Sequence, residues 1–307
     1  MKKKPAAAST VLVATHGEGI NGVALAGGER VLSAAMGRGR EFTKPRQQVL
    51  LWNLDDGAEL GRFGTGTGCV CWHAAMASDG RSVAAGFGDL TLRIWNVDDD
   101  STRTLGTLDG IVASLAWSAD ARFLFTGSCG EQRVRLWDVQ SGSVVAMGKT
   151  KKSATWFVAM SADAKRAISA AGDKLVHVWD PRAGTELTAL AGHTGRINAL
   201  AMNKSGTRAF SASQDKTARI WDLERGAELA VLSGHSKSVE ALALSPDEKH
   251  IATSSADGTV RTWSTRDGSA LSAVSVSDTK AAALAFTSDG ARIVLGCDDG
   301  TVRLLAL

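Results

Sequence analysis

The sequence predicts an all-β protein built from seven similar units in one domain. Three observations lead to this prediction: a fixed repeat, a recurring turn motif and the absence of stretches with helical periodicity. Seven residues, each preceded by a β-branched or aliphatic run, mark the repeat at intervals of 43 residues once and 42 residues five times: Trp52, Trp95, Trp137, Trp179, Trp221, Trp263 and Leu305. A period of about 40–45 residues ending in a Trp-Asp-like pair is typical of proteins whose repeating unit is a small sheet.

The clearest unit runs from residue 192 to residue 222. It predicts strands at 197–202, 207–213 and 218–222, and a fourth strand at 228–233 precedes the next unit. Tight turns separate the strands, because Asp and Gly tolerate left-handed backbone and Asp accepts hydrogen bonds from nearby amides. An Asp six residues before the marker recurs at Asp89, Asp173, Asp215, Asp257 and Asp299. Four strands per period correspond to one blade of a β-propeller.

These residues resemble the WD-repeat (WD40) β-propeller family over essentially the whole chain. The resemblance implies a buried hydrogen-bond tetrad of His, Ser or Thr, Asp and Trp inside a blade, which rigidifies the blade when every member is satisfied. Two blades hold a complete set: His193, Ser211, Asp215 and Trp221 in blade five, and His235, Thr253, Asp257 and Trp263 in blade six.

The other blades depart from the full tetrad. Blade four keeps Ser169, Asp173 and Trp179 but has Lys151 in place of the His. Blade two has Ala85 for the hydroxyl, blade three has Glu131 for the Asp, and blade seven has Leu295 and Leu305 for the hydroxyl and the Trp. We expect these blades to depend more on apolar packing.

The chain end predicts how the ring closes. The last segment, 301–307, has no fourth strand after it, while 9–14 looks like a fourth strand without a blade. By the resemblance, the N-terminal strand completes the last blade and removes an open edge. We therefore expect a flexible basic tail at 1–8 and a single seven-bladed propeller at 9–307. This role argues against a cleaved signal, although Lys2–Lys4 and the apolar run after them resemble one.

Composition and spacing predict no catalytic or metal site. The net charge of +3 exerts no strong pull toward nucleic acid, and no apolar run reaches the length of a membrane span. Cys69, Cys71 and His73 alternate along one strand, but a zinc site needs a fourth ligand. We expect no enzymatic activity, no cofactor and no metal. The four cysteines lack a disulfide framework, which favours a reducing, cytoplasmic location.

The first departure from the repeat is an insertion in blade one. Nineteen residues separate Ser33 from Trp52, against ten from Ser211 to Trp221, so the second hairpin carries nine extra residues at about 36–48. The insertion is rich in cations: Arg38, Arg40, Lys44 and Arg46. Long loops on rigid scaffolds often carry binding residues, and the alternative is a solvated loop without a partner.

The second departure is aromatic. Trp72 and Trp156 align with Asn198 and Glu240, a position that the resemblance places near the top rim of the innermost strand. Basic residues lie close to it in the sequence at Lys151, Lys152 and Arg196. Such a rim suits an acidic or phosphorylated peptide. The alternative is that both indoles pack between neighbouring blades.

The sequence thus favours a non-enzymatic protein-interaction scaffold that binds a peptide or domain on its top face, as a monomer within a larger assembly. The other hypothesis is a nucleic-acid-associated propeller that uses the basic insertion and the N-terminal lysines. Its binding would weaken steeply with salt.

Overall fold

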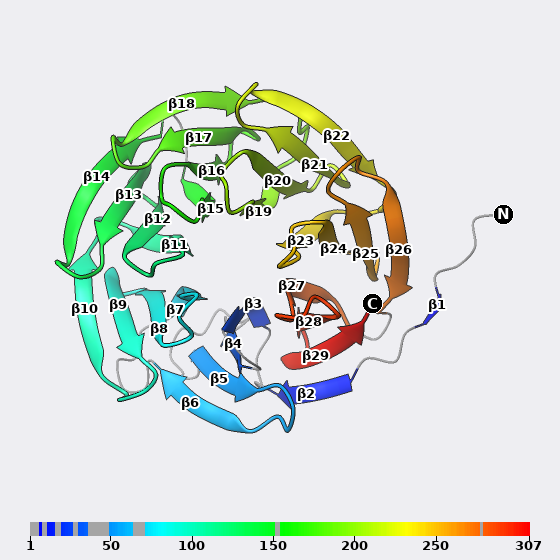
Figure 1. Cartoon of the computed structure of the whole chain (residues 1–307), viewed down its shortest axis with the longest axis horizontal. Helices are drawn as coiled ribbons and strands as arrows, with labels where there is room; N and C mark the ends of the chain where they lie inside the picture. The colour runs from blue at the N-terminus through cyan, green and yellow to red at the C-terminus, as the bar shows by residue number, and fades with distance from the viewer. Residues whose placement is uncertain are drawn as a thin grey trace.

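The computed structural model describes residues 6–7, 11–15, 20–26, 30–35, 49–63, 71–150, 154–276 and 279–307. It shows a ring of seven antiparallel four-stranded sheets, one of which carries an additional short strand (Figure 1). The predicted all-β, seven-bladed architecture is confirmed. None of the described segments forms a helix with the length and apolarity needed to cross a membrane.

We number the blades from the one that contains Trp52. Blade one holds β3 (Ile20–Ala26), β4 (Arg30–Ala35), β5 (Val49–Asn53) and β6 (Glu59–Phe63). Blade two holds β7 (Cys71–Met76), β8 (Ser82–Phe87), β9 (Thr91–Asn96) and β10 (Thr102–Thr107). Blade three holds β11 (Ile111–Trp117), β12 (Phe123–Cys129), β13 (Arg133–Asp138) and β14 (Ser143–Lys149). Blade four holds β15 (Thr155–Met160), β16 (Ala167–Ala171), β17 (Val176–Asp180) and β18 (Thr185–Leu190).

The remaining blades follow the same order from the axis outward. Blade five holds β19 (Ile197–Met202), β20 (Arg208–Ser213), β21 (Thr217–Asp222) and β22 (Ala227–Ser233). Blade six holds β23 (Val239–Leu244), β24 (His250–Ser255), β25 (Thr259–Ser264) and β26 (Ala270–Ser275). Blade seven holds β27 (Ala281–Phe286), β28 (Arg292–Cys297), β29 (Thr301–Ala306) and β2 (Val11–Thr15).

Blade seven joins the two ends of the chain. β2 pairs antiparallel with β29, with Val11 opposite Leu304 and Thr15 opposite Thr301, so the first strand of the ring completes the last blade. The strand lies one to two residues later than the predicted 9–14. Two residues of the segment predicted as a tail, β1 (Ala6–Ala7), pair in parallel with β26 of blade six (Figure 1).

Antiparallel connectivity gives the ring two distinct faces. We call the top face the one where each innermost strand begins and where the second and third strands of each blade are joined. The bottom face carries the other hairpins. Residues of equivalent turns in different blades therefore share one surface.

Small residues let neighbouring blades approach each other closely. Gly86 of β8 has no room for a side chain, because a Cβ atom there would lie 2.3 Å from the Cβ of Val112 in blade three. Gly127 of β12 is similar, since its Cβ would lie 2.6 Å from the Cγ2 of Thr155 in blade four. Such contacts seat each second strand against the innermost strand of the next blade and hold the axial residues in fixed positions.

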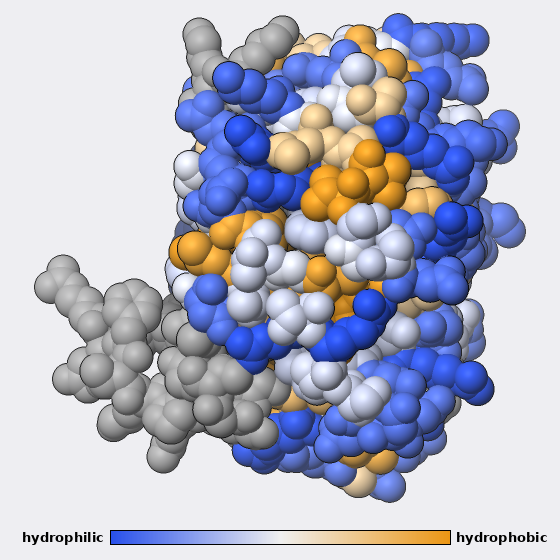
Figure 2. All heavy atoms as spheres, turned by 90° about the vertical axis from the view of Figure 1, so that its left-hand side faces the viewer, coloured by the Kyte–Doolittle hydropathy of each residue, from blue (hydrophilic) through white to orange (hydrophobic). Residues whose placement is uncertain are grey.

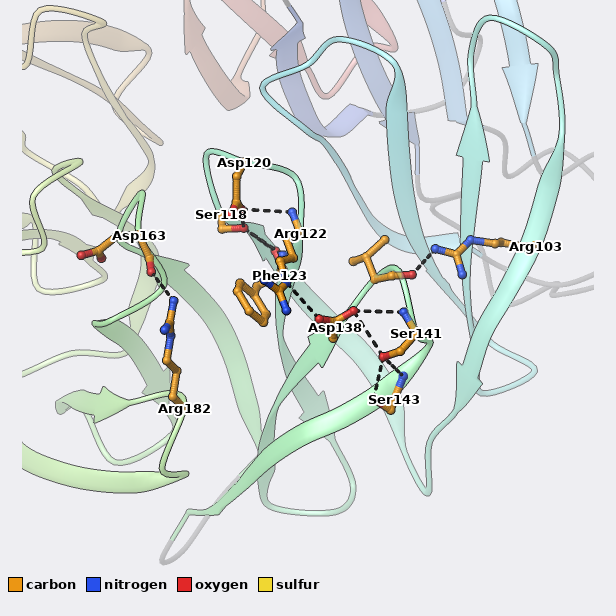
Figure 3. A network of polar contacts seen from close by, with 11 residues as sticks. Arg103, Ser118, Asp120, Arg122, Phe123, Asp138, Ser141, Ser143, Asp163 and Arg182 are labelled. Atoms are coloured by element: carbon orange, nitrogen blue, oxygen red, sulfur yellow. Dashed lines mark hydrogen bonds and ion pairs between the residues drawn. The ribbon is translucent and has the colours of Figure 1, made fainter.

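Polar contacts join blades on the bottom face (Figure 3). Arg103 of blade two donates to the carbonyl of Val139 in blade three. The ring of Phe123 lies between two guanidinium groups, with Arg122 at 5.0 Å and Arg182 of blade four at 5.2 Å from its centroid. Arg122 also pairs with Asp138 at 3.1 Å (Figure 3). These cations are thus engaged within the protein.

The outer rim carries exposed apolar residues on several blades. In five outer strands the residue that the pairing register skips is a large apolar one: Leu60, Val145, Leu187, Leu229 and Leu271. Val144 and Met147 are also exposed beside Val145 in blade three, and Val231 is exposed in blade five. Figure 2 shows separate apolar patches among hydrophilic ones on one side of the ring. Exposed aliphatic residues are ordinary on protein surfaces.

Candidate functional site at the axis of the top face

A cavity of about 520 Å³ opens at the axis of the ring on the top face. Its lining comes from six of the seven blades: Trp72, His73, Ala113, Trp156, Phe157, Arg196, Asn198, Glu240, Ala256, Lys280, Ala281, Ala282 and Asp298. A volume in this range is typical of sites that enclose a small molecule or a side chain. We call it the axial cavity.

A bulge near the start of each innermost strand supplies the axial residues. In blades two to seven the pairing register with the second strand skips one residue: Trp72, Ala113, Trp156, Asn198, Glu240 and Ala282. A bulge redirects the side chain of the unpaired residue. The same six residues all line the axial cavity, so one local irregularity, repeated around the ring, creates the site.

The wall of the cavity has two chemically different halves. Blades two to four contribute Trp72, Trp156 and Phe157 with His73 and Ala113. Blades five to seven contribute the charged and amide side chains, together with three alanines: Arg196, Asn198, Glu240, Lys280, Asp298, Ala256, Ala281 and Ala282. The aromatic half and the charged half face the same space. A ligand with an apolar part and an ionic part matches such a wall better than a uniformly polar one.

Trp156 is the most exposed of the described tryptophans at this site and elsewhere. Its exposed fraction is 38%, whereas Trp221 and Trp263 are 1% exposed and Trp72 is half-buried. The guanidinium carbon of Arg196 lies 5.8 Å from the centroid of the Trp156 ring. Trp156 and Arg196 thus form a paired aromatic and cationic surface at the cavity, a combination found at binding hot spots.

Asn198 holds the charged half in place. Its side-chain amide donates to the Ser238 hydroxyl at 3.1 Å and to the Val239 carbonyl at 2.9 Å, both in the segment that enters blade six. Its amide oxygen accepts a 3.4 Å hydrogen bond from the Nε of Arg196. The terminal nitrogens of Arg196 keep their remaining donors for a ligand.

Titratable groups near the aromatic half are poorly suited to catalysis. Burial lowers the pKa of His73 to about 4, and its Nδ1 is buried without a hydrogen-bond partner. Burial also raises the pKa of the Cys71 thiol to about 12. At neutral pH both groups are therefore uncharged, and neither a thiolate nor an imidazolium is present. Within the described ranges no group of three or more His, Cys, Asp or Glu side chains is arranged to hold a metal; Cys69 lies outside them.

The predicted tetrad residues come together in blades five and six. In blade five, His193 contacts Asp215 Oδ2 at 2.7 Å and Ser211 Oγ at 2.7 Å, and Trp221 Nε1 donates to the same hydroxyl at 2.8 Å. In blade six, His235 contacts Asp257 at 3.1 Å and Thr253 at 2.8 Å, and Trp263 donates to Thr253 at 2.8 Å. These eight residues belong to the scaffold.

We call the Asp or Glu that lies six residues before the Trp or Leu marker the turn acid. In blades without the tetrad His, the turn acid contacts a different side chain, and the sequence analysis missed this contact. In blade four His177 contacts Asp173 at 3.0 Å and Glu186 at 2.8 Å. Arg93, Arg135 and Arg303 occupy the equivalent position and pair with Asp89, Glu131 and Asp299. Each partner lies four residues after its acid and two before the Trp or Leu marker. That spacing is visible in the sequence and was the available signal.

This arrangement leaves the top face with unpaired cations. Because the turn acids have internal partners, six exposed basic side chains form no ion pair with any described residue: Lys149, Lys174, Arg196, Lys216, Lys237 and Lys280. On the bottom face Lys165 and Lys249 pair with Asp163 and Asp247 at 3.1 and 3.9 Å. Arg103, Arg182 and Lys204 donate there to backbone carbonyls, and the exposed Arg266 forms no ion pair with any described residue. Of the two carboxylates that line the cavity, Glu240 is half-buried and Asp298 accepts hydrogen bonds from Thr279 and from the backbone of Lys280.

Several predicted binding residues lie outside the described residues: Arg38, Arg40, Lys44 and Arg46 of the insertion, and Lys151 and Lys152 before blade four. Of the others, Trp72, Trp156 and Arg196 lie together in the axial cavity. Sequence alignment of the blades placed two of them at one position. It missed Lys280 and Asp298, which reach the cavity from blade seven.

Comparison with known proteins agrees with this architecture. The family model "WD domain, G-beta repeat" matches residues 100–138, 184–222, 226–264 and 273–304. One curated relative, Protein Rae1 of Drosophila melanogaster, is 35% identical over 66 residues, which cover 20% of this chain and 19% of that protein. The match therefore spans a small part of either protein. The repeat matches and the seven-bladed ring together show that the chain belongs to the WD40 repeat family.

Proposed function

We propose that this protein is a non-enzymatic scaffold that docks an acidic segment of a partner protein on its top face. WD40 propellers typically serve as protein-interaction scaffolds, which supports the general role. One observation carries the more specific proposal: the axial cavity places the exposed Trp156 beside Arg196, within a face whose lysines lack internal partners.

Charge is the first support for an acidic partner. Six exposed cations of blades three to seven form no ion pair with any described residue on the top face, and two of them, Arg196 and Lys280, line the axial cavity. Their field attracts an acidic segment from solution. The basic residues of 36–48 belong to the segment between β4 and β5, the second hairpin of blade one. We propose that this segment extends the same surface.

The chemistry of the cavity supports binding rather than catalysis. His73 is neutral at neutral pH, Cys71 is a buried thiol, and Arg196 and Lys280 are cations suited to hold carboxylates or phosphates. Three cysteines remain free in the described residues, and we propose a cytoplasmic location, where thiols stay reduced. We further propose that the protein acts as a monomer within a larger assembly.

The test compares charge removal on the two faces. A Lys216→Ala, Lys237→Ala, Lys280→Ala triple variant should lose partners that wild type captures from cell extract. A Lys165→Ala, Lys249→Ala variant alters the bottom face and should keep them, with melting temperatures recorded for both. An unchanged partner set in the triple variant would contradict docking on the top face.

Salt dependence separates a protein partner from nucleic acid. Contact with a phosphate backbone weakens steeply between 50 and 200 mM salt, by about 10³–10⁵ when six to ten phosphates are contacted. A segment anchored at Trp156 should lose far less affinity over this range. Captured nucleic acid with the steep dependence would replace the proposal by the nucleic-acid alternative.

A further inference from the structure

The six axial bulge residues of blades two to seven differ in size. Following the ring from blade two to blade seven, they are Trp72, Ala113, Trp156, Asn198, Glu240 and Ala282. Ala113 lies between the two tryptophans in this order, and all three line the same cavity. It contributes only a methyl group at a position where the blades before and after it contribute an indole. We call the part of the cavity at Ala113 the Ala113 slot.

From this geometry we infer that the Ala113 slot binds one aromatic side chain of the docked acidic segment. The inference rests on the proposed function and deepens it, because it names the residue that would give the segment specificity. Acidic residues on either side of the aromatic one would contact Arg196 and Lys280 in the charged half.

The chemistry of the slot favours an aromatic ring over an acidic group. Trp72, Trp156 and Phe157 line this half of the cavity together with His73, and the only side-chain donors among them are the indole N–H groups and the one N–H of the neutral, buried imidazole. The faces of aromatic rings are electrically negative, so they repel anions but accept another ring in a stacked or edge-on arrangement.

A cationic side chain is disfavoured by the residues already present. The guanidinium of Arg196 lies over the Trp156 ring at 5.8 Å, and the exposed Lys280 lines the same cavity. A ligand cation entering the slot would meet both charges. Glu240 and Asp298 lie in the opposite half, and Asp298 already accepts hydrogen bonds from Thr279 and from the backbone of Lys280 at 3.0 Å.

Ala282 provides a matched control within the same ring. Like Ala113 it is a half-buried bulge residue of an innermost strand and lines the axial cavity. It belongs, however, to blade seven, which contributes Lys280 and Asp298 to the charged half. Enlarging Ala113 fills the slot, whereas enlarging Ala282 adds the same volume elsewhere in the cavity.

The experiment uses fluorescein-labelled heptapeptides of six glutamates that differ only in the central residue, which is Phe, Leu, Ala or Lys. Their dissociation constants are measured by fluorescence anisotropy against the full-length protein. We expect the Phe peptide to bind about tenfold tighter than the Ala peptide and clearly tighter than the Leu and Lys peptides.

Variants then locate the preference. Ala113→Leu should abolish the advantage of the Phe peptide over the Ala peptide, and Ala282→Leu should preserve that advantage. Trp156→Ala removes one wall of the slot at an exposed position and should also abolish it, which covers the case in which Ala113→Leu unfolds.

Equal affinity for the Phe, Leu and Ala peptides would overturn the aromatic slot while leaving acidic docking intact. An Ala113→Leu protein that keeps the preference would place the aromatic site elsewhere and would also overturn it. Binding of none of the peptides would overturn both the slot and the acidic docking proposed above.

Discussion

His177 Nε2 lies 3.0 Å from Asp173 Oδ2, and its Nδ1 lies 2.8 Å from Glu186 Oε1, so a single imidazole joins two carboxylates inside blade four. The ring is almost fully buried, with 5% of its side chain exposed. In blades five and six the turn acid is satisfied by a His that precedes the blade. The Asp of this turn can therefore be hydrogen-bonded by a His that follows it by four residues, as in blade four, or by one that precedes it by 22 residues, as in blade five.

Replacing His177 by Phe should destabilise the protein, because it leaves Asp173 and Glu186 without their partner. The expected loss is about 1–3 kcal/mol in the free energy of unfolding, the usual cost of buried polar groups left unsatisfied. Urea denaturation at pH 7 measures it. A His250→Phe variant makes the same change at a His whose side chain is 46% exposed and 3.8 Å from Asp247, and it should stay close to wild type. Similar losses in both variants would contradict the role of His177.

The two kinds of tryptophan should respond differently to truncation. Trp221→Ala removes a fully buried ring and its hydrogen bond to Ser211, and should cost about 3–5 kcal/mol of folding free energy. Trp156→Ala alters a ring that is 38% exposed and should cost at most about 1 kcal/mol. Thermal or urea unfolding compares them. Comparable losses would show that Trp156 is a structural residue and not a surface for binding.

Acid should destabilise the protein partly through His73. Its pKa in the folded protein, about 4, lies below its ordinary value of 6.5 because burial disfavours the charged ring. The unfolded chain therefore takes up the proton first, and stability is lost as the pH falls from about 6.5 toward 4. Burial lowers the pKa of His193 and His235 as well, so they act in the same direction.

A His73→Leu variant tests this contribution. It removes a titrating group and a buried nitrogen without a partner, so its unfolding free energy at pH 7 should equal or exceed that of wild type. Between pH 7 and pH 5 it should lose less stability than wild type. Urea midpoints at the two pH values measure both effects, and parallel losses in the two proteins would contradict the assignment.

Ring closure can be tested by stepwise truncation. Deleting residues 1–15 removes β2 and exposes the edge of β29, so the melting temperature and the solubility should both fall. Deleting residues 1–10 removes only β1, which contacts β26 through two residue pairs, and should have a smaller effect. An unchanged melting temperature after the longer deletion would show that β2 is dispensable for closure.

Much of the scaffold was predictable because its signals are local. The Trp spacing, the Asp turns and the tetrad residues of blades five and six lie within one repeat each, and the structure brings His193 to Asp215 across 22 positions. The partners in the other blades are also local, four residues after the acid, but the tetrad pattern predicts a partner that precedes the blade. In blade four that pattern points to Lys151 and not to His177, which contacts Asp173.

The sequence by itself determined the number of blades, the closing strand and the alignment of Trp72 and Trp156 at one axial position, because β periodicity and turn chemistry act over short stretches. Only the tertiary structure decided what surrounds those tryptophans. Ring closure brings Lys280 and Asp298 of blade seven into the same cavity as Trp72 of blade two, and repeated bulges turn one residue per blade toward the axis. The aromatic and charged halves exist because distant strands converge there, a relationship that no single repeat encodes.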